Sequence, residues 1–304
     1  MPRLPITKTP KPYVGGAFIR SESGRTFPIK DKEGKFFANM PQCTRKDLRN
    51  AVEAAAKAGP GWAKRTAYNR GQILYRLGEM LEARRQEMAQ VLVAGAATPS
   101  SRNGNESARG RRLTAAAALR EVDTATDRLV YYAGWADKYE QVLGNVNPVA
   151  SAHFNFTVTE PMGVVGVITP DSPSLLGFVS MLAPIIVSGN TVVALASETT
   201  PYPAILFGEM LATSDLPGGV VNVLTGFRKE LLPTFATHTH LRAISAVAGV
   251  AERKMLRLGA AESVKRVRFS DVTDDAGWFA ETAQSAYAIR DFLEFKTTWH
   301  PIGA

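Results

Sequence analysis

The protein has 304 residues, of which 45% are hydrophobic and 21% charged, proportions typical of a folded globular chain rather than a disordered one. Its net charge of +8 comes from basic residues that are scattered apart from a cluster at Arg102–Arg112. No interleaved aromatic residues and no nucleic-acid motif accompany this cluster. We therefore interpret residues 98–112 as a solvated loop, with an acidic partner surface as the alternative, and expect no nucleic-acid partner.

The cysteine content and the apolar runs predict where the protein resides. Cys43 is the single cysteine, which excludes an intramolecular disulfide and is typical of a reducing compartment. The first residues lack the apolar stretch of a signal peptide. The apolar run Leu175–Val187 is too short to span a membrane and is interrupted by Gly177 and Pro184. The sequence predicts a cytoplasmic protein without a membrane partner.

The first third of the chain predicts a layer of hairpins followed by helices. Residues Met1–Pro12 form a Pro- and Lys-rich arm, and the glycine turns within Tyr13–Met40 indicate a meander of short strands. Thr44 is the expected N-cap of a helix over Arg45–Ala58, which Gly59-Pro60-Gly61 should end. Two longer amphipathic helices are predicted over Asn69–Ala94 and Leu113–Gln141.

Two separate segments have the alternating pattern of half-buried strands. In Asn145–Thr159, Phe154, Phe156 and Val158 alternate with polar residues, and Phe292–Trp299 alternates in a similar way. On this pattern the segments are predicted to be edge strands, which either cover their own domain or, because a long exposed edge normally needs a partner, pair with another strand.

The middle of the chain predicts a parallel sheet. Continuous apolar, β-branched runs at Val164–Ile168, Thr191–Leu195 and Val220–Leu224 are separated by apolar helices, the second of them over Tyr202–Thr213. Strands that are apolar on both faces and alternate with helices are typical of a sheet covered on both sides. The predicted fold is therefore α/β, a Rossmann-like doubly wound parallel sheet.

Several motifs of this region resemble the cofactor domain of the aldehyde dehydrogenases. They are EPMGVVGVITP (Glu160–Pro170), APIIVSGNTVV (Ala183–Val193), SETTP (Ser197–Pro201) and LPGGVVNVLTGF (Leu216–Phe227). The resemblance extends to YYAGWADK (Tyr131–Lys138) and to the opening Tyr13–Pro41. Motifs in the same order along most of the chain are more specific than any single glycine pattern.

The resemblance implies a division of the chain. Residues 1–144 and 160–272 would form the cofactor-type Rossmann-like domain with its N-terminal layer, and residues 145–159 and 273–304 the antiparallel β oligomerisation arm. The family's catalytic domain, which follows the cofactor domain and holds the nucleophilic cysteine, is expected to be absent. Only a short helical bridge, Asp274–Arg290, precedes the closing FLEFKTTWHPIGA. This arrangement is similar to the second, pseudo-enzyme unit of two-part aldehyde dehydrogenases.

The sequence lacks the residues that aldehyde oxidation needs, so no catalytic residue is predicted. Cys43 has neither a flanking histidine nor a basic helix start to lower its pKa, and we interpret it as a packed thiol. The family's general-base glutamate aligns roughly with Ser270, and its oxyanion-donating asparagine with Ser172. His238 and His240, like His153 and His300, lack the spacing and partners of metal ligands, so no metal site is predicted.

The family's cofactor-binding residues are also altered, and the resemblance implies only a vestigial set of them in this sequence. That set is Ile168, Thr169, Pro170, Ser197 and Glu198. Glu198 is equally interpreted as an acid at a helix start. The ribose-binding lysine becomes Leu195, the tryptophan beside the cofactor becomes Asp171, whose charge would repel a pyrophosphate, and a phosphate-loop glycine becomes Ala246. The G-F-G turn becomes Gly226-Phe227-Arg228.

Three functional hypotheses follow. The first is a non-catalytic structural or regulatory subunit that pairs, through residues 145–159 and 291–299, with a full-length aldehyde dehydrogenase, with homo-oligomers as the alternative and no cofactor expected. The second is an NAD- or NADP-binding component of an aldehyde-oxidising oxidoreductase. The third is a small-ligand module that reuses the old cofactor pocket through Ser172, Ser197 and Glu198.

Overall fold

The apolar runs form the centre of the fold, which we describe from a computed structural model covering residues 8–95, 113–272 and 274–303. Five parallel strands lie in the order β11-β10-β7-β8-β9, and the hairpin β1-β2 pairs antiparallel with the β9 edge. The strands are β1 (Tyr13–Val14), β2 (Ala17–Phe18), β7 (Val164–Ile168), β8 (Thr191–Leu195), β9 (Val221–Leu224), β10 (Leu241–Ala246) and β11 (Arg266–Phe269). This order confirms the predicted doubly wound α/β fold.

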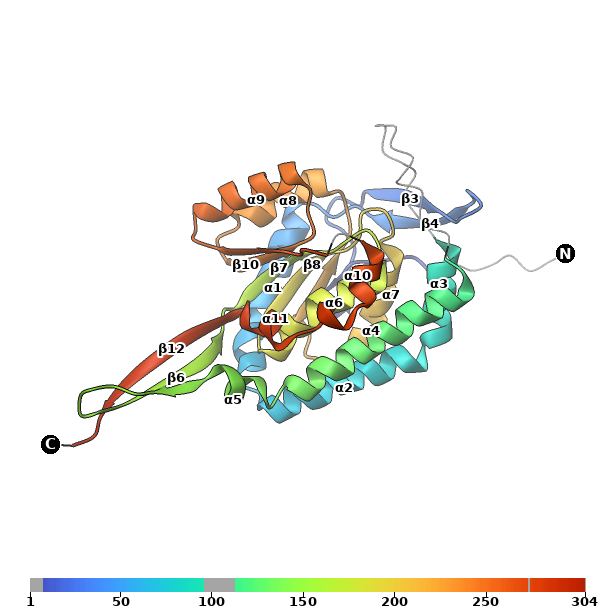
Figure 1. Cartoon of the computed structure of the whole chain (residues 1–304). Coiled ribbons are helices and arrows are strands. Elements are labelled where there is room, and N and C mark those ends of the chain that lie inside the picture. The colour runs from blue at the N-terminus through green and yellow to red at the C-terminus, as the bar shows by residue number, and fades with distance from the viewer. Residues whose placement is uncertain (1–7, 96–112, 273, 304) are drawn as a thin grey trace.

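Helices cover both faces of this sheet, and alternate residues of β7 show how (Figure 1). Val165 and Val167 face the larger core cluster, which includes most of α6 (Ser174–Val187). Val164 and Ile168 face the second cluster, together with α1, α8 and α9. The bounds of the latter three helices are α1 (Arg45–Ala63), α8 (Arg228–Thr237) and α9 (Val250–Ala261). The period-2 alternation of a strand thus supplies two cores at once.

Further helices complete this part of the fold. They are α2 (Ala67–Ala83), α3 (Arg85–Ala94), α4 (Ala115–Trp135), α5 (Tyr139–Leu143) and α7 (Tyr202–Leu211). Helices α2, α3 and α4 pack over α6 and α7, α7 lies beside α6 against β9, and α5 contacts β6. The predicted helix Asn69–Ala94 is wrong in one respect, because it is interrupted at Arg84, whose guanidinium binds Glu87 and Glu209. The predicted helix Leu113–Gln141 is likewise divided, between α4 and α5.

The first helix begins as predicted but ends later. The side-chain oxygen of Thr44 and the carboxylate of Asp47 form a capping box at its start. The helix continues through Pro60 to Ala63, so the predicted stop at Gly59-Pro60-Gly61 is wrong. Trp62 explains the extension, because its side chain is fully buried and its Nε1 donates to the carbonyl oxygen of Ile186 at 2.8 Å.

The N-terminal strands form two hairpins rather than one meander. The second hairpin, β3 (Thr26–Lys30) and β4 (Phe36–Pro41), is a two-stranded sheet of its own, separate from β1-β2. Of the predicted N-terminal arm, residues 1–7 lie outside the described residues, as does the predicted loop at 98–112. Within the described residues, no helix combines the length and apolar character needed to cross a membrane.

An antiparallel sheet extends from the body of the molecule as an arm (Figure 1). It consists of β5 (Asn145–Asn147), β6 (His153–Pro161) and β12 (Leu293–Pro301), with β6 in the centre. The antiparallel pairing of the two segments matches the sequence prediction. The bridge to β12 contains α10 (Asp275–Phe279), a short 3₁₀ turn (Glu281–Ala283) and α11 (Ala286–Arg290).

Asn190 fastens the base of the arm to the central sheet. Its side-chain oxygen accepts from the backbone N–H of Gly163, just before β7, at 2.8 Å. Its Nδ2 donates to the carbonyl oxygen of Phe292, just before β12, also at 2.8 Å. One fully buried amide therefore joins the starts of three strands, since Asn190 itself precedes β8.

Candidate functional site: the carboxyl edge of the parallel sheet

The candidate site lies beyond the carboxyl ends of β7 and β10. In an open parallel sheet, ligands bind at the point where the strand order reverses, which here falls between these two strands. The five predicted residues are at this edge, with Ile168, Thr169 and Pro170 at the end of β7 and Ser197 and Glu198 after β8. The first four are buried and Glu198 is half-buried.

The polar groups of these residues bind one another or the adjoining strands. The Thr169 hydroxyl donates to the carbonyl oxygen of Leu195 at 3.1 Å. The carbonyl oxygen of Ile168 accepts from the N–H of Val247 at 3.0 Å. Their hydrogen bonds hold the ends of β7, β8 and β10 together.

Asp171 caps the turn that follows β8. Its Oδ1 accepts from the Ser197 hydroxyl at 3.0 Å and from the N–H groups of Glu198 and Thr199 at 3.0 and 3.2 Å. Two consecutive backbone N–H groups that point at one oxygen are the arrangement with which proteins bind anions. Here the anion is a carboxylate of the protein itself.

Glu198 occupies the start of α8. Its Oε2 accepts from the N–H of Arg228, the first residue of that helix, at 2.7 Å. Burial raises the pKa of the Glu198 carboxyl, while the Arg228 N–H acts in the opposite direction. Glu198 is therefore an acid at a helix start, but the helix is α8 rather than α7, which follows Glu198 in the chain. Contact of Glu198 with a ribose stays a prediction.

Arg228 was missed by sequence reasoning as a member of the site. Its Nη2 donates to the carbonyl oxygen of Thr169 at 2.5 Å, and its Nη1 to that of Val247 at 3.0 Å. Nη1 also lies 3.4 Å from the Glu252 carboxylate. The loss of a glycine at this position was visible in the sequence, but the direction of the new side chain depends on residues far away in the chain.

Carboxylates also occupy the starts of α6 and α9. Oε1 of Glu121, a buried residue of α4, accepts from the N–H groups of Leu175 and Leu176 at 2.9 and 3.2 Å. Oε2 of Glu252 accepts from the N–H of Gly249 at 3.0 Å. With Glu198 on α8, three helix starts at this edge hold a carboxylate from the same chain, where an open site of this kind offers free N–H groups to phosphate.

Comparisons with known proteins identify the fold that contains this edge. The profile described as "Aldehyde dehydrogenase family" matches residues 18–271. The protein belongs to the aldehyde dehydrogenase family. The chain is 29% identical over 262 residues to the putative aldehyde dehydrogenase DhaS of Bacillus subtilis, covering 85% of this chain and 50% of that protein. It is 32% identical over 271 residues to mouse retinal dehydrogenase 2, covering 88% of this chain and 49% of that protein.

Solved structures of the family have the same fold. The NAD+ complex of the aldehyde dehydrogenase from Bacillus cereus superposes with a TM-score of 0.76 at 24% identity, over 86% of this chain and 50% of that one. PnpE from Pseudomonas sp. WBC-3 superposes with a TM-score of 0.75 at 25% identity, over the same shares. This aldehyde dehydrogenase family member spans about half the length of the curated relatives it matches.

The described residues at the edge do not fit a dinucleotide. The hollow there has a volume of about 270 Å³, below the roughly 300–1,000 Å³ of small-molecule sites. Asp171, Asp274 and Asp275 line it together with Arg228, and the Ser172 hydroxyl donates to Asp275 at 3.0 Å. The N–H groups of Leu175, Leu176 and Arg228 at two of the helix starts already bind carboxylates, and the guanidinium of Arg228 lies between the ends of β7 and β10.

The structure confirms Cys43 as a packed thiol. The residue is fully buried between the N-terminal strands and α1, and its N–H donates to the carbonyl oxygen of Thr225 at 2.9 Å. Burial raises the pKa of the thiol to about 12. A thiol with such a pKa is protonated at neutral pH and is a poor nucleophile. Across the described part of the chain, no cluster of three or more metal-ligating side chains occurs.

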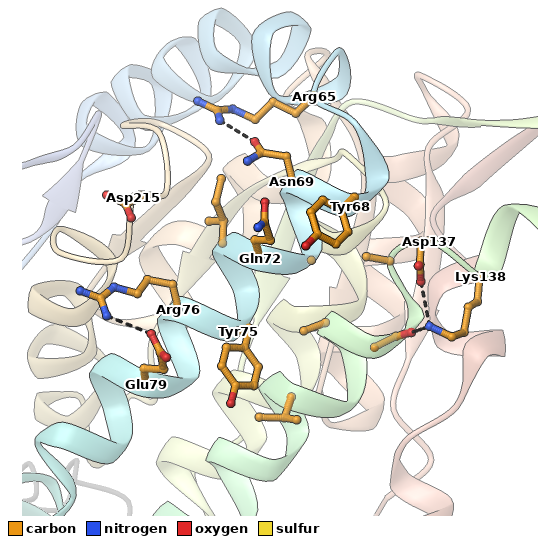
Figure 2. Close-up of a pocket in the computed structure, with 16 residues that line it drawn as sticks. Arg65, Tyr68, Asn69, Gln72, Tyr75, Arg76, Glu79, Asp137, Lys138 and Asp215 are labelled. Carbon is orange, nitrogen blue, oxygen red and sulfur yellow. Dashed lines mark hydrogen bonds and ion pairs between the residues drawn. The ribbon is translucent and has the colours of Figure 1, made fainter.

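A second hollow of about 720 Å³ lies on the outer helical layer of this family member. Figure 2 shows Tyr68 and Tyr75 on α2 facing Asp137 and Lys138 beyond the end of α4. The charged side chains that line this hollow pair with neighbours on their own segment; Nη1 of Arg76, for example, donates to Oε2 of Glu79 at 2.9 Å. Such pairs are typical of a solvated helix surface. We therefore place the candidate site at the sheet edge.

Proposed function

We propose that this aldehyde dehydrogenase family member is a non-catalytic partner subunit. Its arm, through residues 145–159 and 291–299, would pair with a full-length aldehyde dehydrogenase in a structural or regulatory role. The observation that carries the proposal is the exposed state of β12. Residues 294–301 are all exposed, and among the described strands β12 pairs with β6 alone. A free strand edge of this length is suited to strand addition.

The arm also presents apolar side chains on both faces. The register places Phe154, Phe156 and Val158 of β6 on one face, and Phe295 and Trp299 of β12 on the other. Phe154 and Phe295 are both 45% exposed, and Trp299 is 58% exposed. A free edge between two partly apolar faces supports a buried position in an assembly.

The absence of independent catalysis is part of the same proposal. The described bridge from β11 to β12 consists of short helical segments, and the family match ends at residue 271. The single thiol is buried with a raised pKa. A partner with its own catalytic domain would supply the sheet that receives the arm and the nucleophile that this chain lacks.

Mixing experiments on the purified chain test the proposal. Light scattering gives its mass alone and after addition of a full-length aldehyde dehydrogenase from the same organism. We expect a stable mixed complex that is lost in a Phe154→Ser, Trp299→Ser double variant. The matched control is Tyr68→Ser with Tyr75→Ser, because these residues are 68% and 52% exposed but lie on α2. A mixed complex that survives the arm substitutions would contradict the proposal, and a homo-oligomer lost with them would support arm-to-arm pairing instead.

The NAD- or NADP-binding component remains the alternative function. The family membership and the NAD+ complex of the Bacillus cereus neighbour favour it. The occupied helix starts and the position of Arg228 oppose it. Calorimetry with NAD and NADP separates the two, because saturable binding would favour the oxidoreductase component. Binding of an uncharged small ligand at Ser172, Ser197 and Glu198 would favour a ligand module.

A further inference from the structure

Arg228 connects the two strands that border the crevice. Its side chain is 14% exposed, and its two terminal nitrogens reach the carbonyl oxygens of Thr169 after β7 and Val247 after β10. A guanidinium is planar and directs its donors in fixed directions, so these contacts hold it across the crevice rather than along one wall. The side chain thus occupies the space between the ends of β7 and β10.

Asp171, which lines the same hollow, is an acceptor of hydrogen bonds where Arg228 is a donor. Its carboxylate takes the Ser197 hydroxyl and the N–H groups of Glu198 and Thr199. These three donors come from the turn after β8, and Asp171 itself lines the hollow. Arg228 thus satisfies two carbonyl oxygens after β7 and β10, and Asp171 satisfies three donors after β8.

The charge of the residues that line the hollow also opposes binding of a nucleotide. Asp171, Asp274 and Asp275 line it, and the one cationic residue among its lining residues is Arg228. The Arg228 guanidinium is already bound to two carbonyl oxygens and lies near Glu252. An incoming pyrophosphate would meet carboxylates before it met an available cation.

We propose that Arg228 and Asp171 together take the place of an adenine nucleotide at this edge. The intact chain does not take up adenine nucleotides, and removal of the Arg228 guanidinium together with the Asp171 charge reopens a site for them. This proposal is independent of the arm, so the mixing experiments above and the binding experiments below can fail separately.

Calorimetric titration with ADP and with NAD tests the proposal on the full chain. The opening variant is Arg228→Ala with Asp171→Asn, which leaves the net charge unchanged while removing the guanidinium and the competing carboxylate. The matched control is Arg253→Ala with Asp171→Asn. Arg253 donates to the carbonyl oxygens of Ala248 and Ser270 at the same end of the sheet, but does not bridge β7 and β10.

We expect no saturable binding of either nucleotide by the unchanged chain or by the control. The opening variant should bind ADP at least tenfold more tightly than either. Saturable binding by the unchanged chain would overturn the proposal. So would an opening variant that gains nothing, or a control that gains as much.

A labelling experiment on the unchanged chain covers the case in which the opening variant does not fold. Phenylglyoxal modifies accessible guanidinium groups, and the modified arginines are found by mass spectrometry. We expect Arg228 to remain protected when Arg268, whose side chain is 50% exposed, has reacted, and ADP should not change that protection. Equal labelling of the two arginines, or protection of Arg228 that depends on ADP, would contradict the proposal.

Discussion

The two ends of this molecule satisfy their polar groups in opposite ways. At the carboxyl edge of the sheet, Glu121, Glu198 and Glu252 cap three helix starts, and Arg228 binds two strand-end carbonyls. In the arm, β12 leaves one edge without a strand partner among the described residues and exposes apolar side chains. Polar groups at the sheet edge thus bind partners within the chain, while the outer edge of β12 does not pair with another described strand. This difference is the basis on which we propose an assembly role for the chain.

The largest effect is expected at Glu121, because it is the most deeply buried of the three capping carboxylates at the sheet edge. Glu121→Ala leaves the N–H groups of Leu175 and Leu176 without their acceptor. The free energy of unfolding should fall by about 2–4 kcal/mol, since hydrogen bonds to charged groups are worth about 1.5–3 kcal/mol each. Urea denaturation measures it. Glu121→Gln keeps an acceptor oxygen and should lose less, and an alanine variant as stable as the parent would show that the edge is not closed by this carboxylate.

Gly177 tests how tightly the wall of the crevice is packed. A Cβ at this position would lie 2.2 Å from Cγ of Pro170, so Gly177→Ala must displace α6 or the loop after β7. We expect a loss of about 1–3 kcal/mol in the free energy of unfolding. Gly134→Ala is the control, because that helical glycine has open space around it and alanine is the better helix former. Equal melting temperatures of the two variants would mean that the wall is loose.

Glu198 should make stability depend on pH. Its pKa is raised by burial, so the folded chain binds this proton more tightly than the unfolded chain, and the resulting stability is lost as pH rises through the raised pKa. Glu198→Gln mimics the protonated carboxyl. At pH 7 the variant should therefore be more stable than the parent by at most about 1 kcal/mol, because the group is partly solvated. This difference in stability between the variant and the parent should vanish as pH falls below the ordinary pKa of a glutamate. Thermal melts from about pH 4 to about pH 8 measure it, and a difference that grows as pH falls would contradict the prediction.

The smallest effect on stability is expected in the arm. Trp299→Ser removes an exposed ring that contacts His153 near the end of β12. The free energy of unfolding of the isolated chain should change by less than about 0.5 kcal/mol, as is usual for surface substitutions. Chemical denaturation at low protein concentration gives this value. A loss above 2 kcal/mol would show that the arm stabilises its own domain, which was the alternative to an assembly role.

The parts of the fold that were predictable depend on local pattern or on burial of both faces. Val164–Ile168 and Thr191–Leu195 could only be buried strands, and Thr44 with Asp47 is a short-range capping signal. The stop at Pro60 was wrong because burial of Trp62, set by contacts with α6, outweighs the local cost of proline.

The position of the site in the fold was predictable from the sequence, but the side chains that meet there were not. The five residues after β7 and β8 lie at the expected edge, because strand ends of a parallel sheet meet there. Arg228 contacts groups after β7 and after β10, 59 and 19 positions away in the chain, so no sequence period indicates where its side chain goes. The same holds for Glu121, which comes from α4, a helix that precedes the sheet.

The amide of Asn190 has a mechanical consequence. From the turn between α6 and β8, it ties the start of β12 to the start of β7, at the amino end of the parallel strands and opposite Arg228. A pull on the arm by a bound partner would therefore reach β7 and β8 along their length. Tension on the arm would be delivered to the end of the sheet that is remote from the crevice.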